Sequence, residues 1–205
     1  MDDLVEERVR IGQRELRLLR PADPERLLSE EAFADDEFLP YWAELWPSGT
    51  ALAQHVAALD LAGKTVLELG CGLGLPSLAA ALCGASVVAT DWAPPALALL
   101  ERNAQANAVA VAAELLRWDM PGTLAERSFD VVLAADVLYE ARNARPLLDL
   151  LQRVVSRSGV AIVADPGRRH AAGFLERAAL TWQIRSLPEP SLPGGAVYRL
   201  HRANC

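Results

Sequence analysis

The sequence predicts an α/β fold in which a doubly wound, mostly parallel sheet of seven strands carries helices on both faces. Between residues 65 and 164, short apolar runs alternate with stretches of helical periodicity, the pattern of βαβ units. A loop with glycine at three alternate positions joins the first apolar run to the first of these helical stretches. The chain has 205 residues and is 52 % hydrophobic, enough for one well-buried core and short for two. We therefore expect one domain over residues 1–205.

The N-terminal part, residues 1–47, is expected to be an extension in front of the core. Residues 5–19 alternate in character around Gly12-Gln13, which predicts a small hairpin. Short helical pieces and the aromatic cluster "FLPYWAELWPSG" follow. Ser48 is then placed to cap a helix that runs to about Leu59.

The core is expected over residues 63–202. We predict its parallel strands at residues 65–69, 86–90, about 111–116, 129–135 and 159–164, and its helices near residues 76–83, 94–107, 143–156 and 170–179. Two further strands, near residues 181–187 and 196–202, are separated only by the turn "PEPSLPGG". This turn is too short for a helical crossover, so these strands should form an antiparallel C-terminal hairpin.

Charge and hydropathy argue against two classes of partner, nucleic acids and membranes. The formal net charge is −7, and the nineteen arginines beside the single lysine are scattered rather than clustered. Nothing resembles the basic stripe that a nucleic acid backbone requires. The start "MDDLVEERVR" has no secretory pattern, and no apolar window reaches the length of a membrane span. We expect a cytoplasmic protein that binds neither nucleic acid nor membrane.

Metal and disulfide chemistry are not expected either. Cys71, Cys83 and Cys205 show neither paired spacing nor metal-ligand spacing. The three histidines stand in separate predicted elements, and no constellation of ligands emerges. We therefore expect neither a metal site nor a disulfide framework.

The glycine loop predicts a cofactor site on a Rossmann-like strand-to-helix turn. Gly70, Gly72 and Gly74 form the turn after the first core strand, and Pro76 falls in the first turn of the next helix, where a missing N–H costs little. Glycine lets backbone pass close to a ligand, and a helix N-terminus supplies unpaired N–H groups. The dinucleotide pattern G-x-G-x-x-G does not fit, because Gly74 comes one position early. A tight turn without a ligand is the alternative.

Acidic and aromatic residues follow the next three strands at the carboxyl edge of the predicted sheet. Asp91 ends the second core strand, where an acid can accept from ribose hydroxyls. Trp118 and Asp119 follow the third and could flank an adenine, while Asp136 and Tyr139 follow the fourth. Each taken alone could be a helix cap, an ordinary loop or packing. Their convergence on one edge favours a binding site.

These motifs carry a resemblance to a known family. "ELGCGLG" with Asp91, "WD" and "DVLY" resembles the class I, seven-β-strand methyltransferases that use S-adenosylmethionine, and within them the protein lysine methyltransferases with an Asp-x-x-Tyr motif. "YWAELWPSGTALA" and "VADPGR" are similar to stretches of the electron-transfer flavoprotein β-subunit lysine methyltransferases. The resemblance covers roughly residues 38–202.

The resemblance implies roles for individual residues. Glu68 and the three glycines would hold the methionine end of S-adenosylmethionine, with Asp91 on the ribose. Trp118 and Asp119 would hold the adenine. Trp46, from the N-terminal extension, would line the cofactor near its amino-acid portion, with a purely structural tryptophan as the alternative. The cofactor has no phosphate, so its site needs an acid for the ammonium group, which Glu68 supplies.

Asp136 and Tyr139 are the predicted catalytic residues. A lysine acceptor must lose its proton before it is methylated, and Asp136 could receive its ammonium group while Tyr139 forms an aromatic wall for the aliphatic stem. Methyltransferases that act on bases and glutamine amides carry Asn/Asp-Pro-Pro-Tyr at this strand end. "DVLY" has no prolines, which disfavours those acceptors.

Three functions stay open at this point. The first is methylation of a protein lysine, with an electron-transfer flavoprotein subunit as a candidate substrate and a monomeric enzyme. The second is a small-molecule N- or O-methyltransferase on the same fold. The third is a dinucleotide-binding oxidoreductase or a silent binding module. The basic run "GRRH", residues 167–170, reads as a solvated helix start, or as a contact of Arg168 or Arg169 with an acidic patch on a protein substrate.

Overall fold

The computed structural model describes residues 3–27 and 41–203. The predicted N-terminal hairpin is confirmed: β1 (Leu4–Ile11) pairs antiparallel with β2 (Arg14–Pro21) across Gly12-Gln13. Residues 28–40, which include the start of the aromatic cluster, lie outside the described residues. The extension resumes in the short 3-10 helix η3 (Tyr41–Ala43).

The central sheet has seven strands in the order β5-β4-β3-β6-β7-β9-β8. Their bounds are β3 (Thr65–Leu69), β4 (Ser86–Asp91), β5 (Ala112–Leu115), β6 (Phe129–Ala135), β7 (Val155–Asp165), β8 (Trp182–Pro188) and β9 (Ala196–Arg202). Strand β9 runs antiparallel between β7 and β8, which confirms the C-terminal hairpin. The chain order reverses between β3 and β6, and ligands of open α/β sheets bind beside such a switch point.

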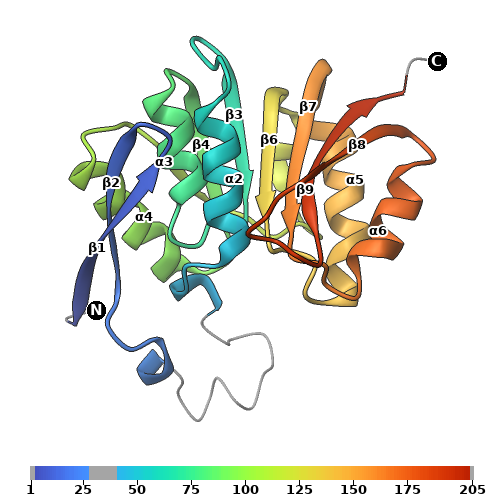
Figure 1. The fold of residues 1–205 in the computed structure, drawn as a ribbon. Coiled ribbons are helices and arrows are strands. Elements are labelled where there is room, and N and C mark those ends of the chain that lie inside the picture. The colour runs from blue at the N-terminus through green and yellow to red at the C-terminus, as the bar shows by residue number, and fades with distance from the viewer. Residues whose placement is uncertain (1–2, 28–40, 204–205) are drawn as a thin grey trace.

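Helices cover both faces of the sheet (Figure 1). The hairpin, α2 (Pro47–Ala57), α3 (Leu75–Leu82) and α4 (Pro94–Ala106) lie on one side, and α5 (Ala144–Val154) and α6 (Ala171–Ala178) on the other. Four 3-10 helices complete the described elements that are not strands or α-helices: η1 (Pro24–Leu27), η3, η4 (Gly122–Glu126) and η5 (Ala141–Asn143).

Alternate strand residues serve the two layers, as the period of two requires. Val66 and Leu133 belong to the core under α2 and α3, whereas Leu67 and Val132 belong to the core under α5 and α6. Parallel strands buried on both faces read as continuous apolar runs, which is why the sequence pattern located them well.

Two details differ from the sequence prediction. Strand β7 begins at Val155, four residues earlier than expected, because α5 ends at Val154 and Val155 already pairs with Phe129 before a register shift. Ser48 is not a helix cap. Trp46 occupies the N-cap position of α2, and Ser48 lies inside the first turn, fully buried, with its hydroxyl turned to Asp136.

Within residues 3–27 and 41–203, no group of His, Cys, Asp and Glu side chains is arranged to hold a metal ion. Cys71 and Cys83 are free thiols in that same part of the chain. None of the helices described there is long and apolar enough to span a membrane.

Candidate functional site

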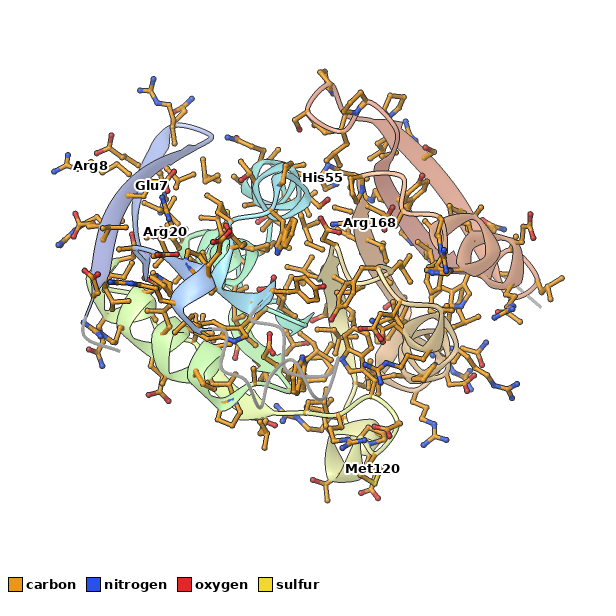
Figure 2. All side chains as sticks on the ribbon, turned by 90° about the horizontal axis from the view of Figure 1, so that it is seen from below. Glu7, Arg8, Arg20, His55, Met120 and Arg168 are labelled. Atoms are coloured by element: carbon orange, nitrogen blue, oxygen red, sulfur yellow. The ribbon has the colours of Figure 1, made fainter. Side chains whose placement is uncertain are left out.

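A cavity opens at the carboxyl edge of the sheet beside the switch point, the edge seen in Figure 2. Nine of the ten site residues predicted from the sequence line it: Trp46, Glu68, Gly70, Gly72, Gly74, Asp91, Trp118, Asp136 and Tyr139. The tenth, Asp119, lines an adjoining cavity that shares Tyr41, Gly70, Trp92, Trp118 and Tyr139 with the first. Residues from four strand ends and from the segment before α2 therefore meet in one place.

The three loop glycines are required by backbone conformation and by close packing. All have positive φ, of 69° at Gly70, 50° at Gly72 and 81° at Gly74. A Cβ at Gly72 would sit 3.0 Å from the carbonyl oxygen of Trp42, and one at Gly74 would sit 2.1 Å from Leu100 Cδ1. The atoms that exclude side chains at Gly72 and Gly74 belong to the protein, so packing and positive φ favour glycine there independently of any ligand.

Glu68 ends its strand fully buried, with one oxygen accepting from both the backbone N–H and the hydroxyl of Ser77. Ser77 is the third residue of α3, so this carboxyl caps the helix from the neighbouring strand. Burial raises the pKa of Glu68 to about 8, and the nearby Asp91 carboxylate adds to the shift. Burial therefore favours the protonated carboxyl at neutral pH, and a cationic partner in the adjacent cavity would favour its ionised form.

Asp91 ties the glycine loop to the end of β4. One carboxylate oxygen accepts the Gly72 N–H at 2.9 Å and the other accepts the Ala93 N–H at 3.0 Å. Burial raises the pKa of Asp91, while these backbone donors act in the opposite direction. Asp91 thus both shapes the loop and lines the cavity.

Asp136 adopts a left-handed backbone conformation, with φ of 56°, directly after β6. Its side chain is 4 % exposed and already has two partners: Arg168 Nε donates to Oδ1 at 2.8 Å, and the Ser48 hydroxyl donates to Oδ2 at 3.3 Å. Non-glycine residues rarely hold this conformation, and such outliers gather at functional sites. The predicted acceptor of an ammonium group is therefore part of a preformed ion pair.

An aromatic cluster forms the wall next to Asp136. The rings of Tyr41 and Tyr139 lie 5.3 Å apart at 57°, and the Tyr41 and Trp46 rings lie 6.3 Å apart. Trp46 Nε1 donates to the Tyr41 carbonyl at 2.8 Å, and the Arg168 guanidinium lies 5.4 Å from the Trp46 ring centre. Burial raises the pKa of Tyr139 to about 12, so its hydroxyl stays protonated at neutral pH.

The side chains of Trp118 and Asp119 have different surroundings in the structure. The Trp118 ring packs over Gly70, where a Cβ would lie 3.5 Å from Trp118 Cζ2. The Asp119 carboxylate turns to Arg117, with an N–O distance of 3.0 Å, and this pairing lowers the pKa of Asp119. Trp118 is thus a wall of the main cavity, and Asp119 lies at its margin.

The charges around the main cavity are one-sided. Among the described residues that line it, four carry carboxyl groups, Glu44, Glu68, Asp91 and Asp136, and none is a lysine, arginine or histidine. A pyrophosphate bound in the main cavity would meet no cationic side chain among the described residues of its lining. A ligand with positive centres fits this lining far better.

Comparison with known proteins decides the family. A family model described as "Lysine methyltransferase" matches residues 40–179. The chain belongs to this lysine methyltransferase family. The match confirms the resemblance carried by the glycine loop, the "DVLY" turn and the tryptophan-proline segment, all of which lie inside it.

Several curated proteins are similar to this chain in sequence. The electron transfer flavoprotein beta subunit lysine methyltransferase of Mus musculus is 32 % identical over 175 residues, which cover 79 % of this chain and 67 % of the relative. The Danio rerio protein of the same name is 37 % identical, over 63 % of this chain and 51 % of its own length. A histone-arginine methyltransferase of Xenopus laevis is 31 % identical, over 72 % and 66 %. This chain therefore spans about half to two thirds of these relatives.

Solved structures confirm the Rossmann-like methyltransferase fold. A T. thermophilus 16S rRNA methyltransferase, in complex with AdoMet and guanosine, aligns with a TM-score of 0.72 at 18 % identity, over 99 % of this chain and 52 % of that one. A TehB-like SAM-dependent methyltransferase from Corynebacterium glutamicum aligns with a TM-score of 0.62 at 17 % identity, over 88 % and 100 %.

Sequence reasoning missed three contributors to the site. For Arg168 the sequence predicts a solvated helix start or a contact with an acidic patch on a substrate, but its Nε donates to Asp136 instead. Figure 2 labels Arg168 near the middle of the edge view. Ser48 was read as a cap, and Ser77 was not singled out. The placement of "DPGR" at a strand end was the one available signal for Arg168, since side chains at that edge converge.

Proposed function

We propose that this protein is an S-adenosylmethionine-dependent methyltransferase that methylates a lysine side chain of a protein. The observation that carries the proposal is the cavity lining of four carboxyl groups without a cationic side chain, next to the glycine turn. A dinucleotide would place two phosphates against these acids, which argues against the oxidoreductase alternative. Membership of the lysine methyltransferase family supports the same choice.

The residues present fit this cofactor. S-Adenosylmethionine supplies an activated methyl group on a positively charged sulfur. Glu68 would hold the ammonium group, and Gly70 and Gly72, which have no side chain, would let the backbone of the turn approach it closely. Asp91 would accept from the ribose hydroxyls and Trp118 would pack on the adenine, with Asp119 at the margin.

Tyr139, Trp46 and Asp136 would serve the acceptor. Tyr139 and Trp46 wall the cavity where an aliphatic lysine stem can lie, and they exclude water from the reacting atoms. Asp136 would position the amine nitrogen by a hydrogen bond. Little acid–base machinery is required once a neutral amine is aligned.

The acceptor we favour is the β subunit of an electron-transfer flavoprotein. The support is that two of the relatives above are named for methylating that subunit. We also expect a monomeric, cytoplasmic enzyme that uses neither nucleic acid nor membrane as a partner. A small-molecule acceptor is the second candidate, because the same fold also serves small-molecule N- and O-methyltransferases.

The decisive experiment measures tritium transfer from methyl-labelled S-adenosylmethionine to recombinant bacterial electron-transfer flavoprotein, with mass spectrometry to locate the modified residue. Parallel reactions use total protein and the low-mass fraction of a bacterial lysate. We expect label on a lysine of the β subunit. Label only in the low-mass fraction would favour the small-molecule candidate. Binding of reduced nicotinamide dinucleotide without binding of S-adenosylhomocysteine would refute the methyltransferase.

Asp136→Asn tests the acceptor role within the same assay. Asparagine tolerates positive φ, so the turn should survive. We expect S-adenosylhomocysteine affinity within about twofold of wild type and transfer reduced at least about tenfold, because the acceptor is no longer held in line. Asp149→Asn, at an exposed carboxylate of α5, is the matched control and should change neither quantity. A folded Asp136→Asn enzyme with the wild-type rate would remove Asp136 from the acceptor site.

A further inference from the structure

The loop after β7 holds Arg168 in a fixed position. The Asp165 Oδ1 atom accepts the N–H groups of Gly167 at 2.8 Å and Arg168 at 2.7 Å. Gly167 has φ of 94°, and a Cβ there would lie 2.1 Å from the carbonyl oxygen of Gly194. The loop therefore interlocks with the turn between β8 and β9, and a side chain at position 167 is excluded.

From this position Arg168 contacts Asp136 without lining the cavity itself. Its Nε donates to Asp136 Oδ1 at 2.8 Å, and its guanidinium lies over Trp46, but Arg168 is not among the described residues that line the cavity. Its side chain is 36 % exposed, whereas that of Asp136 is 4 % exposed. The hydrogen bond to Asp136 is therefore a direct route by which Arg168 can influence a group inside the cavity.

The pair determines the charge that an incoming amine meets. An isolated buried carboxylate would bind an ammonium group and hold its proton, since an opposite charge favours the charged form. An ammonium nitrogen has no lone pair to accept a methyl group. A carboxylate already neutralised by an arginine can still accept a hydrogen bond, but it favours the charged amine far less.

We propose that Arg168 is a positioning residue that neutralises Asp136, so that the acceptor slot prefers the neutral, reactive form of the lysine amine. The inference rests on the proposed lysine methyltransferase function. In the transfer step the amine proton leaves to solvent first. The amine lone pair then forms the new N–C bond as the S–C bond breaks, leaving a neutral thioether and a methylammonium product.

Other charged or titratable groups face this pair. Asp165 lies at the end of β7, Tyr41 precedes α2, and Tyr139 follows β6. Glu44, Glu68 and Asp91 line the rest of the cavity. Of these groups, Asp165 and Tyr41 also interact with the Arg168 charge, whereas the others are no part of its ion pair, so Arg168→Lys, which keeps the charge, is the reference for the charge-removing variants.

The experiment compares Arg168→Gln and Arg168→Met, which remove the charge, with Arg168→Lys, which keeps it. Arg169→Gln is the matched control, because Arg169 follows in the same loop and bonds His170 instead. The first readout is binding of n-butylamine, which is protonated at pH 7 and imitates the lysine side chain, measured by saturation-transfer NMR. We expect the two charge-removing variants to bind it about tenfold more tightly than wild type, and Arg168→Lys and Arg169→Gln to match wild type.

The second readout is the pH dependence of kcat/KM for methyl transfer. In Arg168→Gln the rising limb should move about one pH unit to the alkaline side, because the slot then favours the protonated amine. A lower rate without any shift, or unchanged n-butylamine binding, would overturn the inference and leave a structural role. Unfolding of both charge-removing variants beside a folded Arg168→Lys would do the same. If wild type methylates nothing, the proposed function fails, while n-butylamine binding still tests the pair.

Discussion

At the scale of single residues, the site contains carboxyl groups such as Glu68 whose burial is energetically unfavourable. Four carboxyl groups at this sheet edge, Glu68, Asp91, Asp136 and Asp165, are buried. All four accept hydrogen bonds, but within the described part of the chain only Asp136 forms an ion pair, and burial raises the pKa of the other three. A binding site for a cation is thereby prepared at a cost in stability.

Stability should therefore fall as the pH rises through the neutral range. The pKa of Glu68 is about 8 in the folded chain against an ordinary value of 4.5, so between these values the folded state holds a proton that the unfolded chain has released. The free energy of unfolding then decreases with pH, by at most about 1.4 kcal/mol per pH unit from this group. Urea denaturation at pH 5, 6, 7 and 8 measures the slope.

Glu68→Gln is the matched variant for this slope. It keeps an oxygen for the Ser77 donors but does not titrate, so its stability should decline less between pH 5 and 8 than that of wild type. Parallel curves for the two proteins would show that Glu68 does not carry the raised pKa.

The glycine turn between β3 and α3 sets the geometry at the scale of an element. Gly74 is the N-cap of α3 in the left-handed conformation, and its Cα packs against Leu100 of α4. Gly74 thus marks the start of α3 and allows the close approach of α4. It also lies where the loop lines the cavity.

Gly74→Ala should destabilise the protein by about 2 to 4 kcal/mol, from backbone strain together with overpacking against Leu100. Gly173→Ala is the control with the same chemical change. Gly173 lies within α6 with nothing inside 4 Å of its would-be Cβ, so alanine there should stabilise by about 0.5 to 1 kcal/mol. Denaturant unfolding of both variants measures whether their changes in unfolding free energy have opposite signs. Equal effects would contradict the packing argument.

At the scale of the whole molecule, two asparagines fasten the N-terminal hairpin to the core. Asn103 of α4, fully buried, accepts from the Leu19 N–H and donates to the carbonyl groups of Leu19 and Leu73. Asn107 exchanges hydrogen bonds with the backbone of Arg17. Because Leu73 belongs to the glycine loop, Asn103 connects the hairpin with the site.

Asn103→Ala should cost about 2 to 4 kcal/mol of unfolding free energy, because it leaves the buried Leu73 carbonyl and two partly buried backbone groups of Leu19 without this partner. It should also weaken S-adenosylhomocysteine binding and speed tryptic cleavage after Arg14 and Arg17. Asn107→Ala should speed cleavage as well but leave cofactor affinity unchanged, since it does not reach the loop. Titration calorimetry and timed proteolysis separate the two. Equal cofactor affinity in both variants would disprove the connection through Leu73.

Much of the fold could be predicted from the sequence because strands, helices and turns are encoded by local patterns of residues. Strands buried on both faces appear as apolar runs, so the parallel sheet, the C-terminal hairpin and the order of the elements followed from periodicity and spacing. Nine of the ten predicted site residues meet at one cavity because residues after parallel strands share an edge. The one-domain organisation, the monomeric state and the cytoplasmic location stay predictions.

The tertiary structure alone decided the partners of those residues. Arg168 and Asp136 stand 32 positions apart and Ser48 and Asp136 stand 88 apart, and no periodicity encodes such pairings. The requirement for glycine at positions 72 and 74 likewise comes from Trp42 and Leu100, segments that only the folded chain brings close. Side-chain direction and burial settle whether a carboxylate is free, capping or paired, and these arise from packing between distant segments rather than from the local pattern.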